Sequence, residues 1–131
     1  MDLMTIRQLE GKRFSVEIRN HRLESDMHKE DGGEDCGMSP AELLVGSLGA
    51  CIGMMVKAYC DMHGLPSEGI SVDAVPTLAT GPTRIGNVAI DVTLPSGFPE
   101  DKKESVLRFA KHCPVHNTLL HPPEIDMDIA P

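Results

Sequence analysis

The feature that most constrains this chain is a long apolar segment in its first half. No charged residue stands between Glu42 and Lys57. Ser39 and Pro40 precede the segment as an N-cap and a first-turn proline, and Glu42 completes the pattern of a capping box. Gly64 is a stop signal for a helix. We therefore predict one helix that begins at Pro40 and ends just before Gly64.

The length of the uncharged segment decides between a membrane span and a core helix. A membrane span takes about 20 apolar residues, and residues 43–56 are too few. A helix that is apolar all round must then be covered on every side, which one small sheet and one further helix cannot do. We predict that a second copy of the chain covers the rest, in a homodimer. Gly46, Gly49 and Gly53 would either admit the backbone of the second copy or relieve crowding within one chain.

The remaining patterns predict an α+β fold with a mainly antiparallel sheet. Strands are expected, from alternation and turn residues, at residues 3–9, 13–19, 21–26, 70–79 and 85–94. A second helix is expected from Pro99 to Lys111, with an apolar stripe that ends at Cys113. A last strand is expected at residues 124–129, where apolar and acidic residues alternate. The order βββ-α-ββ-α-β describes a single domain of residues 1–131.

Charge and composition exclude several classes of partner. The chain has 131 residues and a formal net charge of −8, whereas nucleic-acid-binding proteins usually carry a basic patch. We therefore expect no nucleic-acid partner. The first residues are charged and lack the apolar region of a secretory signal. We expect a cytoplasmic protein without a membrane partner, whose four cysteines stay reduced and form no structural disulfide framework.

The four cysteines differ in their surroundings. Cys51 lies in the middle of the apolar helix and, taken alone, is read as a small buried hydrophobe. Cys60 faces the opposite side of that helix and is expected to pack in the core. Cys36 stands among acidic residues in a polar loop that we expect to be mobile, and its thiol should stay protonated. Cys113 ends the second helix, because Pro114 disfavours helical geometry before it. If the two helices pack together, Cys51 and Cys113 would face each other as a dithiol couple.

A metal site is the alternative for the C-terminal cysteine. The possible ligands there are His112, Cys113, His116 and His121, and C-x-x-H is half of a common zinc pattern. Structural zinc sites normally have two such pairs, and no second pair has this spacing. We therefore expect no metal and no other cofactor, and we expect His116 to cap the helix or to hydrogen-bond locally.

Two motifs together resemble a known family. SPAELLVGSLGAC at residues 39–51 and HCPVHNTL at residues 112–119 are similar to the paired motifs of the OsmC/Ohr family, osmotically inducible protein C and organic hydroperoxide resistance protein. The resemblance covers essentially the whole chain and is closest to the YhfA-like branch. It implies an intertwined homodimer whose sheets wrap the central helices, with two active sites at the subunit interface.

The resemblance also implies a function, a thiol-dependent peroxidase that reduces organic hydroperoxides. It assigns Cys51 as the peroxidatic thiol, which becomes a sulfenic acid, and Cys113 as the resolving thiol, which closes a disulfide. An external dithiol would then reduce that disulfide. Arg13 best matches the family's arginine that steadies the thiolate from the partner subunit, although Lys12 stands beside it.

This chain departs from the hydroperoxide branch at the start of its long helix. That branch carries a carboxylate directly after the helix-opening proline, where this chain has Ala41. Glu42 is turned about 100° around the helix from that position and is expected to serve the capping box. An apolar site lined by Met54, Met55 and Phe109 would favour bulky organic hydroperoxides. The alternative function is a non-catalytic OsmC-like dimer that binds a small apolar ligand or a thiol.

Overall fold

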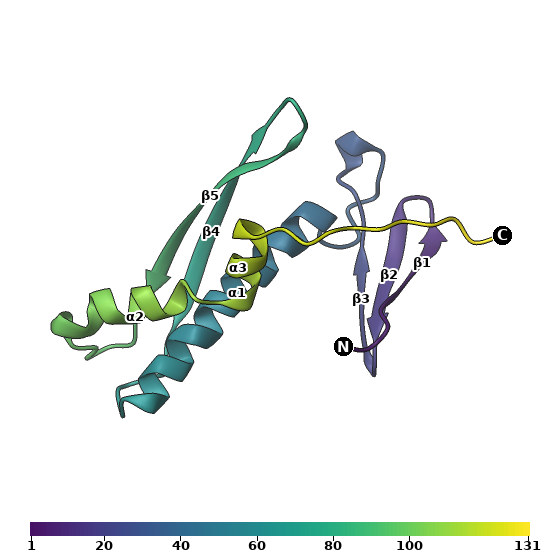
Figure 1. The fold of residues 1–131 in the computed structure, drawn as a ribbon. Helices are drawn as coiled ribbons and strands as arrows, with labels where there is room; N and C mark the ends of the chain where they lie inside the picture. The colour runs from purple at the N-terminus through teal and green to yellow at the C-terminus, as the bar shows by residue number, and fades with distance from the viewer. The chain divides into compact units, whose positions relative to one another are not determined.

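The computed structural model describes residues 1–131 as a mixed α+β chain (Figure 1). The elements are β1 (Thr5–Glu10), β2 (Arg13–Ile18), β3 (His21–Ser25), η1 (Lys29–Asp31), α1 (Pro40–Met62), β4 (Ser71–Ala79), β5 (Arg84–Thr93), η2 (Glu100–Lys102), α2 (Lys103–Ala110) and α3 (Pro114–Leu120). All strand pairs are antiparallel, in a sheet β1-β2-β3 and a sheet β4-β5. The predicted fold class is confirmed.

The packing of the chain distinguishes two compact units. The N-terminal unit comprises residues 1–46, and the C-terminal unit comprises residues 47–131. The helix α1 begins in the first unit and continues in the second. The single domain of residues 1–131 stays a prediction.

The sheet of the N-terminal unit has one charged face and one apolar face. On the charged face, Arg7 forms an ion pair with Glu17 across β1 and β2. On the other face, Ile6 and Leu23 lie directly opposite Val16, because residues paired across antiparallel strands share a face. Ile6 is 54% exposed and Leu23 is 42% exposed. The apolar face of this sheet is therefore largely uncovered in one copy of the chain.

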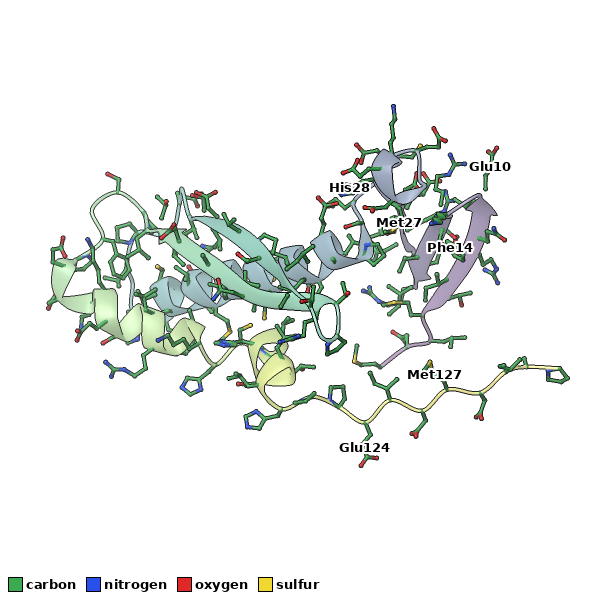
Figure 2. The ribbon with its side chains drawn as sticks, turned by 90° about the horizontal axis from the view of Figure 1, so that it is seen from above. Glu10, Phe14, Met27, His28, Glu124 and Met127 are labelled. Atoms are coloured by element: carbon green, nitrogen blue, oxygen red, sulfur yellow. The ribbon has the colours of Figure 1, made fainter.

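The loop between β3 and α1 is organised around one buried carboxylate. The side chain of Asp26 accepts hydrogen bonds from the backbone N–H groups of Met27 at 2.7 Å and of Glu34 and Cys36 at 3.1 Å each. These bonds, that of Cys36 first, lower the pKa of the Asp26 carboxyl group because they stabilise its charged form. Met27 and His28 lie at the start of this loop (Figure 2). The loop that we expected to be mobile is thus anchored at both ends of its polar stretch.

The core of the C-terminal unit is built on one face of α1. Its buried side chains recur at helical spacing, namely Leu48, Ile52, Val56, Tyr59 and Cys60. Val106, Ala110 and Cys113 join the same cluster from α2 and the residue that precedes α3, which confirms the predicted apolar stripe. Val72 and Ile90 pack on this cluster from the β4–β5 hairpin. Cys60 is fully buried, as expected for a packing residue.

Two glycines of α1 face β4 within the same chain. A Cβ atom at Gly49 or Gly53 would lie 3.8 or 3.6 Å from the side chain of Val72, which is ordinary van der Waals contact. A Cβ atom at Gly46 would meet nothing within 4 Å. An alanine would therefore fit at all three positions, and packing within one chain does not require glycine at any of them.

The length and hydropathy of α1 would by themselves suffice for a membrane span. The core helix of a soluble protein passes the same test, because it is also long and apolar. The stripe from Leu48 to Cys60 belongs to the core cluster of the C-terminal unit, so the core explains the apolar residues on this face of the helix.

The region around Cys113 differs from the prediction. Residues 100–102 form the 3₁₀ turn η2, so that α2 begins only at Lys103. After Cys113 the chain starts a third helix that we did not predict. Cys113 is extended and serves as the N-cap of α3, and Pro114 takes the first helical position, where its missing N–H is not needed. The dipeptide Cys-Pro was a start signal as well as a stop signal.

The predicted last strand is wrong for one copy of the chain. Residues 122–131 form neither helix nor strand, although Glu124 and Met127 point to opposite sides of the extended segment (Figure 2). The apolar residues of the segment are Ile125, Met127 and Ile129, which are 77%, 88% and 98% exposed. A strand needs a neighbour for its backbone hydrogen bonds, and within one copy this segment pairs with none.

Candidate functional site

Cys51 and Cys113 meet in the C-terminal unit. α1 carries Cys51, and the apolar stripe of α2 continues to Cys113, so the packing of the two helices brings the two side chains together. Both cysteines are free of any disulfide, and Cys51 is near enough to raise the pKa of the Cys113 thiol. That the two thiols act as a couple stays a prediction.

Cys113 is held as a buried, protonated thiol. Its side chain is completely buried and accepts a hydrogen bond from the backbone N–H of His116 at 3.2 Å. Burial raises the pKa of the Cys113 thiol, and the neighbouring Cys51 thiol raises it further, while the backbone N–H groups of His116 and Val115 act in the opposite direction. The net direction is upward, so Cys113 keeps its proton at neutral pH.

Cys51 is the more accessible of the two cysteines. The residue is partly exposed and packs against the core cluster, as Met55 and Phe109 also do. The ring of Phe109 in turn contacts the ring of Tyr59, with centroids 5.6 Å apart. All three residues therefore pack on the same apolar cluster, and the role of Met55 and Phe109 as substrate contacts stays a prediction.

Met54 lies in a different place from the other two proposed substrate contacts. It is 72% exposed and lines a groove of about 590 Å³ between α1 and residues 67–72. Neither Met55 nor Phe109 lines this groove. The structure thus does not bring Met54, Met55 and Phe109 into one pocket.

Arg13 and Lys12 are placed by contacts inside the N-terminal unit. The Nε atom of Arg13 lies 3.7 Å from a carboxylate oxygen of Glu24, and a hydrogen bond to Cys36 is the largest cause that raises the pKa of Arg13. The Nζ atom of Lys12 donates to the backbone carbonyl of Asp31 at 2.9 Å. The side chain of Lys12 is therefore held by the loop between β3 and α1. The role of Arg13 toward a thiolate stays a prediction.

Glu42 serves the capping box of α1. Its carboxylate accepts the backbone N–H of Ser39 at 2.9 Å, and the Ser39 hydroxyl accepts the backbone N–H of Glu42 at 3.2 Å. The sequence did not indicate a second partner, His28, whose Nε2 atom lies 3.1 Å from the same carboxylate. Glu42 raises the pKa of His28, and the Ser39 bonds together with His28 lower the pKa of Glu42.

One cluster has the donor types of a cation site. Ligand atoms of His28, Glu30 and Asp31 lie within 4.8 Å of one another. Both acids are exposed, and the His28 ring also contacts Glu42 and Glu30. Ion pairing of a surface histidine with acids accounts for this arrangement.

Comparisons with known proteins agree with the observed architecture. The family described as OsmC-like protein matches residues 31–128. The comparison with curated proteins gives no match. A putative osmotic stress induced and detoxification response protein of Psychrobacter arcticus is 20% identical, with a TM-score of 0.84 over 90% of this chain and 88% of that chain.

Two further solved structures share the fold. An OsmC-like protein of Mycoplasma pneumoniae is 17% identical, with a TM-score of 0.80 over 93% of this chain and 89% of that chain. The organic hydroperoxide resistance protein OhrB of Bacillus subtilis is 16% identical, with a TM-score of 0.66 over 90% of this chain and 89% of that chain. These likenesses establish the fold, and the family match extends over most of the sequence. This chain belongs to the OsmC-like family.

Proposed function

We propose that this protein is a thiol-dependent peroxidase that reduces organic hydroperoxides. The observation that carries the proposal is that the partly exposed Cys51 packs against the buried cluster that contains Cys113, inside an OsmC-like fold. One structural neighbour of this chain is an organic hydroperoxide resistance protein.

The difference in burial between Cys51 and Cys113 favours different roles for them in the reaction. A peroxide reaches Cys51, because the residue is partly exposed, whereas Cys113 has no exposed surface. Burial also raises the pKa of Cys113, and only a thiolate is a good nucleophile. Cys51 is therefore the attacking sulfur, and Cys113 acts after Cys51 has been oxidised.

The proposed reaction has three steps. The Cys51 thiolate attacks the distal oxygen of the hydroperoxide, the O–O bond breaks, and the alcohol leaves with one proton while Cys51 becomes a sulfenic acid. The Cys113 sulfur then attacks the Cys51 sulfur, and water leaves as the disulfide forms. An external dithiol reduces this disulfide by thiol exchange and is itself oxidised to a disulfide.

We further propose that the protein works as a homodimer in the cytoplasm, where its free thiols stay reduced. Two sets of uncovered apolar residues support a second copy: Ile6 and Leu23 on the β1–β3 sheet, and the C-terminal segment around Met127. Surfaces of this kind mark interaction sites. Arg13 of the second copy is the candidate for the group that steadies the Cys51 thiolate.

Peptide mapping after oxidation tests the function. One equivalent of cumene hydroperoxide is added to the reduced protein, and the chain is digested without reductant. We expect a disulfide between Cys51 and Cys113. The Cys113→Ser variant should accumulate sulfenic or sulfinic acid on Cys51, and the Cys51→Ser variant should not react. Cys60→Ser is the matched control, because Cys60 is buried in the same cluster and takes no part in the reaction.

Three results would contradict the proposal in different ways. A Cys51→Ser variant that still consumes hydroperoxide would remove Cys51 from the chemistry. A bridge through Cys36 in the Cys113→Ser variant would make Cys36 the resolving thiol. A wild-type protein that is inert toward hydroperoxides with every dithiol tested would favour the alternative function, a dimer that binds a small ligand in the groove beside Met54.

A further inference from the structure

The helix α2 differs in charge from the rest of this acidic chain. From Lys102 to Pro123 the sequence contains four lysines or arginines and one acidic residue, Glu104, whereas the whole chain has a formal net charge of −8. All four cations lie in residues 102–111, which end two residues before Cys113. An excess of positive charge therefore leads directly to one of the two cysteines of the candidate site.

Three of these cations have no acidic partner. Lys102, Arg108 and Lys111 take part in none of the ion pairs of the structure. Arg108 and Lys111 are exposed, and Lys102 is half-buried. By contrast, every arginine of the β1–β3 region pairs with a carboxylate. The positive charge of α2 is thus not neutralised within the chain.

Helix stability explains only part of this charge. Cations near the end of a helix interact favourably with its dipole, which suits Arg108 in the last turn and Lys111 at the C-cap. At the start of a helix the preference is reversed, yet Lys102 is the N-cap residue of α2 and makes no capping hydrogen bond with its side chain. Lys103, the first helical residue, adds a second cation there. The charge at the start of α2 therefore calls for another explanation.

The last step of the proposed reaction brings an anion to this part of the protein. A thiol attacks a disulfide as its thiolate, whereas an organic hydroperoxide is uncharged. Consecutive Cα atoms lie about 3.8 Å apart, so the backbones of Lys111 and Cys113 are separated by less than about 8 Å. This separation does not exceed the Debye length at physiological ionic strength, about 8 Å. The cations of α2 therefore act on the reductant rather than on the hydroperoxide.

We propose that Lys102, Arg108 and Lys111 select a small thiol reductant that carries a further negative charge, an inference that rests on the proposed peroxidase function. The thiolate of the reductant attacks the Cys51 sulfur, the bond to Cys113 breaks, and Cys113 leaves with the electron pair and takes up a proton. A second thiol of the reductant then releases Cys51 from the mixed disulfide, and the reductant is oxidised to a disulfide. Cys51 is only partly exposed, which favours a small molecule over the dithiol of a folded protein.

Two matched thiols test this selection on the oxidised full-length protein. Cumene hydroperoxide closes the Cys51–Cys113 disulfide, and an alkylating quench follows its reduction. 2-Mercaptoethanol and 2-mercaptoethanesulfonate share a two-carbon chain and differ by one negative charge. Per thiolate, we expect the sulfonate to react about tenfold faster at low ionic strength, at the lower end of electrostatic steering. High salt should reduce this advantage to about twofold, because it screens exposed charges. The net charge of −8 by itself predicts the opposite order, with the uncharged thiol faster.

A pair of double variants locates the effect. Arg108→Gln/Lys111→Gln should lose most of the advantage of the sulfonate, and its Cys51 should still be oxidised at the wild-type rate, because the hydroperoxide is uncharged. Lys29→Gln/Arg84→Gln is the matched control. It removes two cations that also take part in no ion pair, and it should keep the advantage. The salt dependence of the wild type tests the selection without any variant.

The other outcomes overturn the inference in distinct ways. Equal rates for the two thiols in the wild type, or a faster uncharged thiol, would show that α2 selects no anion. An equal loss in both double variants would assign the advantage to the net charge of the chain. A salt-dependent advantage shown only by an acidic thioredoxin would replace the small molecule by a protein. If hydroperoxide closes no disulfide, the peroxidase proposal fails separately, because diamide can close the bridge for the same rate measurements.

Discussion

Replacing Gly53 by alanine tests what the glycines of α1 are for. Glycine in a helix interior costs about 1 kcal/mol relative to alanine. The added Cβ atom would lie 3.6 Å from the side chain of Val72, so it gains a contact without a clash. We therefore expect Gly53→Ala to raise the free energy of unfolding by about 1 kcal/mol. With about 2.1 cal/mol/K of unfolding entropy per residue, a chain of this length would melt about 3–4 °C higher.

Thermal unfolding at a fixed protein concentration, with light scattering on the same samples, measures both stability and association. Gly46→Ala is the matched variant, because it has the same gain in helix propensity and its Cβ atom meets nothing within 4 Å of its own chain. We expect only Gly46→Ala to weaken association if the second copy approaches that part of α1. The reasoning is refuted if Gly53→Ala lowers the unfolding temperature or dissociates the protein, since Gly53 would then face the backbone of the second copy.

Three further predictions concern the assembly, the substrate and the pH dependence of stability. Light scattering at micromolar concentration should give about twice the chain mass of 14.2 kDa, and a well-folded monomer would contradict the dimer. Cumene hydroperoxide should be turned over faster than hydrogen peroxide in steady-state assays, because Met55 and Phe109 share the apolar surroundings of Cys51; equal rates would argue against an apolar site. His28→Gln should lower the free energy of unfolding most between pH 4.5 and pH 6.5. These limits are the ordinary pKa values of Glu42 and of His28. The raised pKa of His28 contributes stability that is lost as the pH rises through its folded value, and the lowered pKa of Glu42 contributes stability that is lost as the pH falls through its folded value. Chemical denaturation across this range checks the third prediction, which a pH-independent difference would contradict.

The parts of the fold that could be predicted depend on neighbours in sequence. The capping box of Ser39 and Glu42, the strands β1 to β5 and the apolar stripe of α2 all follow from spacing along the chain. The helix α3 was missed although its signal was local. Pro114 was interpreted only as the end of one helix, whereas proline is equally suited to the first position of the next.

For the candidate site, the sequence alone predicted that the two cysteines face each other only on the condition that the two helices pack together. The inward direction of Cys113 followed from a helical stripe, yet Cys51 alone looked like an ordinary core residue. The cluster that the two cysteines share, and the burial that raises the pKa of Cys113, exist only because α1 and α2 pack together. The buried, unpaired Nδ1 atom of His116 was not predictable either, because whether a polar atom has a partner depends on the packing around it.

By itself the sequence determined the strands and helices from β1 to α2, their order, and the family motifs at residues 39–51 and 112–119, because propensity, capping and periodicity act over a few residues. Only the tertiary structure decided which faces are covered. It placed Gly49 and Gly53 beside Val72 of β4, and it left the alternating segment around Met127 without a strand neighbour. The physical reason is that alternation marks a segment able to join a sheet, whereas a strand exists only where another backbone supplies its hydrogen bonds.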